Sequence, residues 1–113
     1  MCSRDQAMQI LGEVFHTCNQ SFEKHVNDTF LYGSYARGDY HEESDVDILL
    51  TVEQPQSTIS KCRMDIARLS SDLSLVHDIT VSISVKPAEQ FERFNTVLPL
   101  YQNVVREGIR YAS

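Results

Sequence analysis

Two aspartates separated by one residue, Asp45 and Asp47, are the residues of this sequence best suited to chemistry. They begin a run that extends to Val52 and has the alternation typical of a β-strand. Residues two apart on a strand point to one face, with Cα atoms about 6.5–7 Å apart. Such carboxylates can share one divalent cation or bind two cations about 3.5–4 Å apart. Oxygen ligands without histidine or cysteine favour Mg²⁺ over zinc.

A glycine–serine pair, Gly33 and Ser34, precedes the aspartates at the end of a short β-type run. Glycine lets the backbone approach a bulky anion, and exposed N–H groups at the start of a helical turn attract phosphate. Arg37 adds a positive charge nearby, although it could instead pair with Asp39 or Glu42. A phosphate-binding turn that faces a metal-binding acid pair is the arrangement needed for phosphoryl or nucleotidyl transfer.

A third acid, Asp78, lies at the start of the clearest strand pattern, residues 77–85. It alternates with apolar residues, so all three acids would share one open face if this strand lies beside that of Asp45 and Asp47. Asp78 would then accept the proton of an attacking hydroxyl or act as a shared metal ligand. Alternatively, Asp78 is an ordinary residue at the start of a strand and has no catalytic role.

Helices and strands alternate along the chain around these residues. The periodicity predicts helices over 3–25, 58–75, 87–93 and 99–107, one helical turn at 34–37, and strands over 29–32, 45–52 and 77–85. This order favours an α/β (α+β) fold, a small mixed sheet with helices packed on one face. A chain of 113 residues fits one domain with one core.

The composition excludes several classes of protein. Ten Lys+Arg against 16 Asp+Glu give a net charge of −6, so we expect no direct binding to nucleic acid. No apolar stretch reaches the roughly 18–20 residues of a membrane span, and the polar N-terminus does not resemble a secretory signal. Three cysteines, Cys2, Cys18 and Cys62, fit no zinc spacing, so we expect reduced thiols and a cytoplasmic protein.

The segment Gly33-Ser34, ten further residues and Asp45-Val46-Asp47 resembles the signature of the minimal nucleotidyltransferases of the DNA polymerase beta superfamily. The similarity is tight over residues 31–50 and loose as far as Asp78. It implies that residues 1–113 are a single minimal nucleotidyltransferase domain that transfers a nucleoside monophosphate from ATP with Mg²⁺. By this resemblance the catalytic and metal-binding residues are Asp45, Asp47 and Asp78, and the nucleotide-binding residues are Gly33, Ser34, Arg37 and Ser44.

Chains of this size in the family are often antitoxins of bacterial toxin–antitoxin pairs, whose toxin carries a HEPN domain, an all-helical ribonuclease. The resemblance therefore implies transfer of AMP to a tyrosine of a HEPN toxin, which silences it. Two alternatives remain open: transfer to a small hydroxyl compound, and a non-catalytic antitoxin that acts by binding. The apolar residues near the C-terminus exceed what one small core can absorb, which leaves room for a partner surface or a homo- or hetero-oligomer.

Overall fold

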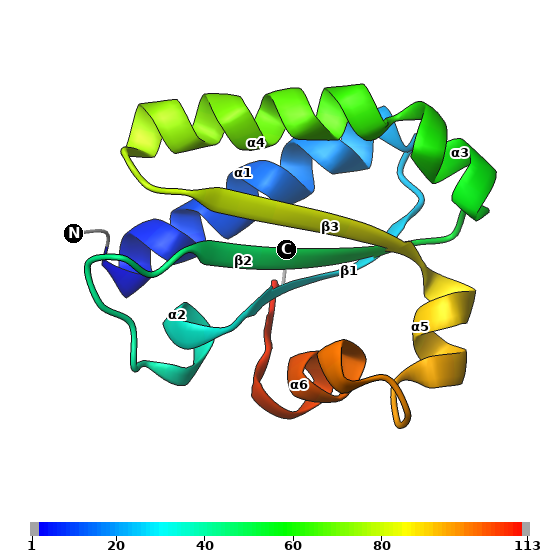
Figure 1. Cartoon of the computed structure of the whole chain (residues 1–113). Helices are drawn as coiled ribbons and strands as arrows, with labels where there is room; N and C mark the ends of the chain where they lie inside the picture. Colours follow the sequence, from blue (N-terminus) through cyan, green and yellow to red (C-terminus); the bar gives the residue numbers. More distant parts are fainter. Residues whose placement is uncertain (1–2, 112–113) are drawn as a thin grey trace.

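The structure, a computed structural model, describes residues 3–111, which form a four-stranded mixed sheet and its helices (Figure 1). The elements are α1 (Arg4–Ser21), β1 (Val26–Tyr32), α2 (Ser34–Arg37), β2 (Val46–Val52), α3 (Gln56–Lys61), α4 (Arg63–His77), β3 (Val81–Pro87), α5 (Ala88–Phe94), α6 (Pro99–Glu107) and β4 (Ile109–Arg110). The predicted mixed α/β class is confirmed, and Cys2 lies outside the described residues. None of the helices within residues 3–111 is long and apolar enough to cross a membrane.

The strands of the sheet are arranged in the order β3-β2-β1-β4. The central strand β2 is antiparallel to β1 and parallel to β3, and β4 adds an antiparallel pair to the other side of β1. In this register Tyr32 pairs with Asp47 on one side and Ser82 pairs with it on the other. Paired residues of neighbouring strands point to the same face, so two hydroxyl-bearing side chains flank Asp47.

The larger core lies between the sheet and helices α1, α3 and α4, which all cover the upper face in Figure 1. Its fully buried side chains include Ile10, Leu11 and Val14 from α1 and Val46, Ile48 and Leu50 from β2. The residues of α1 recur at spacings of one and three, which places them on one helix face. Ser3 caps this helix by accepting a hydrogen bond from the N–H of Gln6. The core therefore fixes β2, the strand that carries Asp47.

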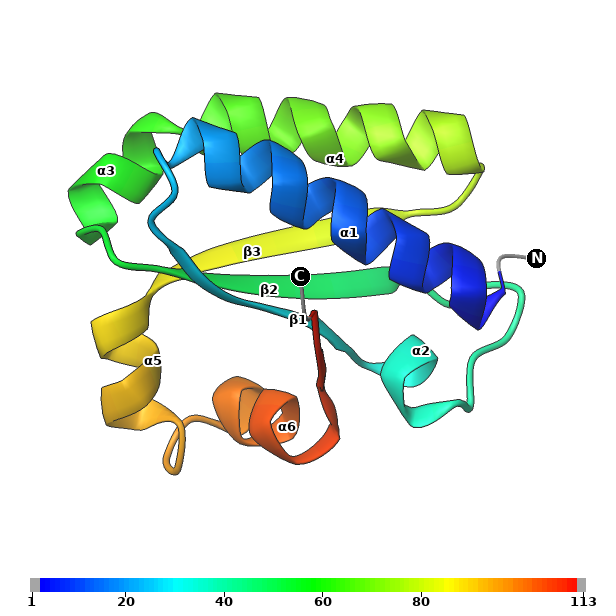
Figure 2. The ribbon, with the colours of Figure 1, turned by 180° about the vertical axis from the view of Figure 1, so that it is seen from behind.

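A smaller core covers part of the opposite face of the sheet. Leu49 is buried there with Phe91 of α5 and with Tyr101 and Val104 of α6. Figure 2 shows from behind that α5 and α6 lie on the side of the sheet opposite to α1 and α4. The prediction that helices pack on one face was therefore incomplete. It describes α1, α3 and α4, whereas the apolar residues of α5 and α6 are buried against the other face.

The predicted long helix over 58–75 is two helices, α3 and α4, which meet at Cys62. The backbone N–H of Cys62 donates to the carbonyl groups of Ile59 and Ser60, which closes α3 as a tight turn. No glycine or proline marks this break, so the periodicity alone did not show it. Strand β1 also begins earlier than predicted, at Val26, because pairing with β2 outweighs the poor strand propensity of the asparagine and aspartate that follow.

The predicted strand over 77–85 begins instead at Val81. Helix α4 continues to His77 and ends at Asp78, whose backbone is left-handed (φ 52°) and whose N–H donates to the carbonyl of Ser74. Aspartate is one of the few residues that adopt this conformation readily. Asp78 is therefore the C-cap of a helix and does not lie on the strand.

Candidate active site

The turn between β1 and α2 is built around Gly33. Its backbone has φ 77° and ψ −155°, a conformation that side-chain-bearing residues rarely adopt. A Cβ atom at this position would also lie 2.5 Å from Oδ2 of Asp47. Glycine is thus required both for the backbone conformation and for space. The backbone of the turn lies directly against the carboxylate of Asp47. The turn and the face of the sheet that carries Asp45 and Asp47, called the acid face below, therefore form one site.

Helix α2, which follows the turn, is anchored on two sides. The guanidinium of Arg4 donates to the carbonyl of Ala36 at 2.8 Å, which ties α2 to the start of α1. Tyr35 is fully buried, and its ring stacks on that of Tyr40 with centroids 4.4 Å apart. Ser34, the first residue of α2, is therefore held in place beside the glycine.

Ser44 closes the loop that leads from α2 to the aspartates. Its Oγ accepts the N–H of His41 at 2.9 Å, and its own N–H donates to the carbonyl of His41 at 3.0 Å. The side chain is buried. These bonds fix the residue directly before Asp45, which is a positioning role. A contact between Ser44 and a nucleotide stays a prediction.

The aspartates lie at the start of β2, where Asp45 is exposed and Asp47 is half-buried. Val46 and Ile48 alternate with them and are fully buried in the larger core, so both carboxylates face the opposite side. Burial raises the pKa of Asp47, the charge of Asp45 raises it further, and Arg37 lowers it. A cation between the two carboxylates would relieve their repulsion.

The donor atoms of this site fit Mg²⁺. They are carboxylate oxygens at Asp45 and Asp47, with the hydroxyl-bearing Tyr32 and Ser82 on either side of Asp47 in the sheet. Magnesium prefers oxygen ligands, and it is usually bound by one or two carboxylates and completed by water and substrate phosphates. The backbone of Gly33, which lies against Asp47, is where such a phosphate could approach.

Arg37 is exposed and is engaged with two acids. Its Nε lies 3.2 Å from Oδ2 of Asp39, and its Nη1 lies 3.1 Å from Oε2 of Glu107 at the end of α6. These hydrogen bonds, with Glu107 as the stronger cause, raise the pKa of the guanidinium. The pairing with Asp39 that the sequence left open is therefore observed. A contact between Arg37 and a nucleotide stays a prediction.

Tyr32 is a residue of this site that sequence reasoning missed. Its side chain forms a hydrogen bond with Ser84 of β3, so the ring crosses the central strand beside Asp47. Burial, followed by the charge of Asp47, raises the pKa of the Tyr32 hydroxyl. The available signal was its position directly before Gly33, at the end of the strand that leads into the turn.

The structure does not place Asp78 on a strand face with Asp45 and Asp47. Asp78 ends α4, before β3 starts at Val81, and the residue of β3 beside Asp47 is Ser82. Within residues 3–111, no three His, Cys, Asp or Glu side chains are grouped so that they could hold a metal ion. The prediction of a three-acid face is therefore wrong, because the strand begins later than its alternation suggested. The carboxylates of Asp45 and Asp47 remain as candidate metal ligands.

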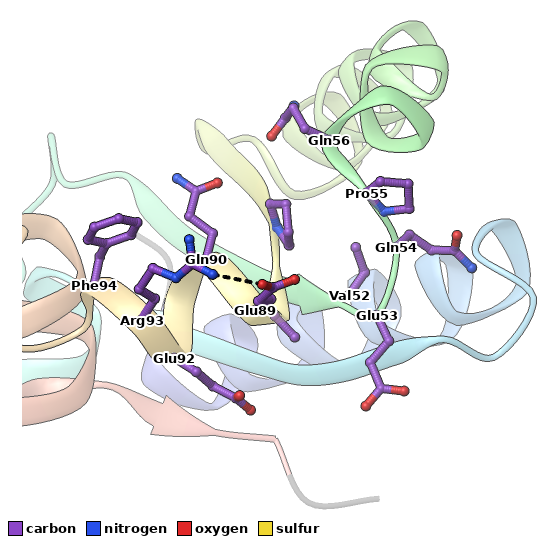
Figure 3. Close-up of a pocket in the computed structure, with 12 residues that line it drawn as sticks. Val52, Glu53, Gln54, Pro55, Gln56, Glu89, Gln90, Glu92, Arg93 and Phe94 are labelled. Carbon is purple, nitrogen blue, oxygen red and sulfur yellow. Dashed lines mark hydrogen bonds and ion pairs between the residues drawn. The ribbon is translucent and has the colours of Figure 1, made fainter.

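A hollow of about 770 Å³ lies at the other end of β2 and β3 (Figure 3). Its lining includes Val52, the last residue of β2, and an ion pair at 2.9 Å between Glu89 and Arg93 of α5. Asp45 precedes the first residue of the same strand, and a strand of this length extends roughly 20 Å. The hollow is thus distant from the acid pair, and its arginine is already paired. We assign the chemistry to the acid pair because of its residue types.

Comparison with known proteins identifies the family. A family model described as "Nucleotidyltransferase domain" matches residues 13–111. The chain belongs to this family. This nucleotidyltransferase domain is also 35% identical over 77 residues to "Putative protein adenylyltransferase MJ0141" of Methanocaldococcus jannaschii, an alignment that covers 68% of this chain and 76% of that protein. The resemblance seen in the Gly-Ser and Asp-x-Asp segment is confirmed.

Solved structures share the fold of this nucleotidyltransferase. A crystal structure named as a "putative nucleotidyltransferase from Sulfolobus solfataricus" has a TM-score of 0.62 at 20% identity and covers 96% of this chain and 81% of that chain. A chain of a crystal structure described as "the toxin-antitoxin with AMP-PNP" has a TM-score of 0.57 at 19% identity, and the alignment covers 89% of this chain and 73% of that chain. At these identities the similarity establishes the fold.

Proposed function

We propose that this nucleotidyltransferase transfers AMP from ATP to a hydroxyl group of a partner protein, with Mg²⁺ as its cofactor. The contact between the backbone of Gly33 and the carboxylate of Asp47 carries the proposal. A triphosphate bound at the turn would lie beside two negatively charged side chains, an arrangement that is stable only with a cation between them. This is the layout that nucleotidyl transfer needs.

In the proposed reaction the acceptor oxygen attacks the α-phosphorus of ATP. The bond from that phosphorus to the oxygen that bridges to the β-phosphate breaks, pyrophosphate leaves, and the proton of the acceptor hydroxyl passes to water, since the residue of β3 beside Asp47 is Ser82. Gly33 and Ser34 would hold the triphosphate, while Asp45 and Asp47 would hold the metal. Bound Mg²⁺ supplies neutralisation of the phosphate charge. The turn after β1 and its pairing strand β2 hold the triphosphate-binding residues beside the metal-binding residues.

For the acceptor we propose a tyrosine of a HEPN toxin, so that this single domain, residues 1–113, acts as a cytoplasmic antitoxin. A similar protein named as a protein adenylyltransferase and a toxin–antitoxin structure with the same fold support this proposal. A partner surface is also available beside the acid face. The exposed apolar side chains there are Phe94, Val97, Leu98, Leu100 and Val105, in α5, α6 and the segment between them.

A second candidate function is silencing of the toxin by binding, without transfer of AMP. One observation favours it: the residue beside Asp47 on β3 is Ser82, so among residues 3–111 no third carboxylate joins the pair to take up the acceptor's proton. In this case the toxin would be neutralised by contact alone.

The two functions can be separated with ATP labelled on the α-phosphate. The protein is incubated with this ATP, Mg²⁺ and the purified product of the neighbouring gene as the candidate toxin, and modified peptides are identified by mass spectrometry. We expect label on a tyrosine of the toxin, with at least about a 100-fold loss for Asp45→Asn or Asp47→Asn. The control is Asp72→Asn, an exposed aspartate of α4. An unlabelled toxin that is nevertheless bound and silenced would favour the second function and contradict the first.

A further inference from the structure

We propose that this site binds one magnesium ion with its nucleotide, not two, because position 82 of β3 carries a serine. The proposal rests on the nucleotide binding proposed above and specifies its metal content. In two-metal sites that transfer phosphoryl groups, the two ions lie about 3.5–4 Å apart and both need anionic oxygen ligands. The number of carboxylates on the acid face therefore limits how many ions it can hold.

The register of the sheet places Ser82 beside Asp47. These two residues pair across the parallel strands β3 and β2, whose backbones lie about 4.8 Å apart in such a pair. Val81 and Val85 of β3 are buried in the larger core, so Ser82 faces the acid side with Asp47. A carboxylate at position 82 could reach an ion about 4 Å from one bound at Asp47. The serine offers only a short neutral hydroxyl.

The other neighbours of the acid pair do not replace this carboxylate. Tyr32, on the opposite side of Asp47, has its hydroxyl hydrogen-bonded with Ser84. Asp39 and Glu107 are both engaged in ion pairs with Arg37. Within the part of the chain that the structure describes, no third acid joins the aspartate pair in a metal-binding group. One ion can share Asp45, Asp47 and the phosphates, whereas a second ion would have no carboxylate of its own.

The test counts bound metal directly and does not depend on transfer. The full chain is titrated with Mn²⁺ and α,β-methylene ATP, which cannot donate AMP, and bound Mn²⁺ is measured by electron paramagnetic resonance. We expect one Mn²⁺ per bound nucleotide, with the spectrum of an isolated ion. Ser82→Asp should raise the count to two and produce the broadened spectrum of a coupled pair. Ser82→Asn, which has nearly the shape of aspartate without its charge, should leave the count at one.

Two results would overturn this proposal while leaving the proposed function intact. The first is two Mn²⁺ ions per nucleotide in the unmodified protein. The second is a count that stays at one in Ser82→Asp although this variant is folded by circular dichroism and binds the nucleotide. If the unmodified protein binds neither nucleotide nor nucleotide-dependent Mn²⁺, both this inference and the proposed function fail, and the absence of nucleotide binding identifies that case.

Discussion

A Cβ atom on Gly33 would lie 2.5 Å from Oδ2 of Asp47, so the backbone of one residue and the side chain of the other occupy adjoining space. The pairing of Tyr32 with Asp47 across β1 and β2 produces this contact, because Gly33 directly follows Tyr32. The sheet therefore builds both halves of the candidate site at once. A nucleotide bound at the turn cannot avoid the acid face.

Replacing Gly33 by alanine should destroy nucleotide binding. The added Cβ would collide with Asp47, and the backbone conformation at Gly33 (φ 77°, ψ −155°), which is open almost only to glycine, would cost about 1–3 kcal/mol in addition. We expect the dissociation constant for Mg²⁺ and an ATP analogue, measured by calorimetry, to rise at least about tenfold, as for a loss of some 1.4 kcal/mol.

Gly38→Ala is the matched control for this substitution. Gly38 also has a positive φ, 92°, but a Cβ there would meet no atom within 4 Å. This variant places a side chain on an ordinary left-handed backbone (ψ 2°) without a collision, and it should retain nucleotide binding. Equal weakening of binding in both variants would show that the contact with Asp47 is irrelevant.

Asp47→Asn should stabilise the protein at pH 7 in the absence of Mg²⁺. The folded state raises the pKa of Asp47 above its ordinary value of 3.8, so ionising this carboxyl costs more in the folded than in the unfolded chain. That cost is absent below the unfolded pKa and reaches its full size once the pH exceeds the raised pKa. Because Asp47 is only half-buried, the expected gain in the free energy of unfolding is below about 1 kcal/mol.

Chemical unfolding at pH 7 and near pH 3 measures this effect. The difference between Asp47→Asn and the unmodified protein should disappear near pH 3, where the carboxyl is protonated in both states. Asp72→Asn, at an exposed position of α4, should stay within about 0.5 kcal/mol at both pH values. Destabilisation by Asp47→Asn at pH 7 would mean that the ionised carboxylate stabilises the fold.

The affinity for Mg²⁺ and nucleotide should fall as the pH is lowered through the raised pKa of Asp47. Only the ionised carboxylate binds the metal, so protons compete with Mg²⁺ at this position. Calorimetric titrations from pH 7 to pH 4.5 should show progressive weakening of binding. The affinity of Asp47→Asn should already be low and should change with pH only through the terminal phosphate of the nucleotide, whose second pKa is about 6. The same pH dependence in both proteins would argue against Asp47 as a ligand.

Glu107→Gln should strengthen nucleotide binding if Arg37 contacts the phosphates. Glu107 holds the guanidinium of Arg37 at 3.1 Å, and weakening this pair makes the positive charge available to the ligand. We expect a dissociation constant that is lower by about two- to five-fold. Arg37→Ala should raise the constant several-fold, and the double variant should match Arg37→Ala alone. Unchanged affinity in all three variants would remove Arg37 from the site.

The sequence was sufficient to predict the mixed fold and the segment that contains the site. Local signals carried these predictions: the alternation around Asp47, the Gly-Ser turn, and the apolar stripe of α1 that begins at the Ser3 cap. Each of them depends on neighbours close in the chain. The identification of the nucleotidyltransferase family rested on the same segment and is confirmed.

Predictions failed where a contact between distant residues decides the outcome. The alternation of Asp78 with apolar residues predicts a strand, yet the hydrogen bond from its N–H to the carbonyl of Ser74 makes it a helix cap. The pairing of Ser82 with Asp47 depends on the register between β2 and β3, which no local pattern encodes. The position of α5 and α6 on the acid face likewise follows from the burial of Leu49 against Tyr101.

The most direct test of this account is a calorimetric titration of the protein with a non-transferable ATP analogue, with and without Mg²⁺. The same titration is repeated on a variant that combines Asp45→Asn with Asp47→Asn. We predict binding that depends on Mg²⁺ in the unmodified protein and an affinity at least about tenfold lower in the variant. Equal affinity in both proteins, or binding that does not change when Mg²⁺ is removed, would contradict it.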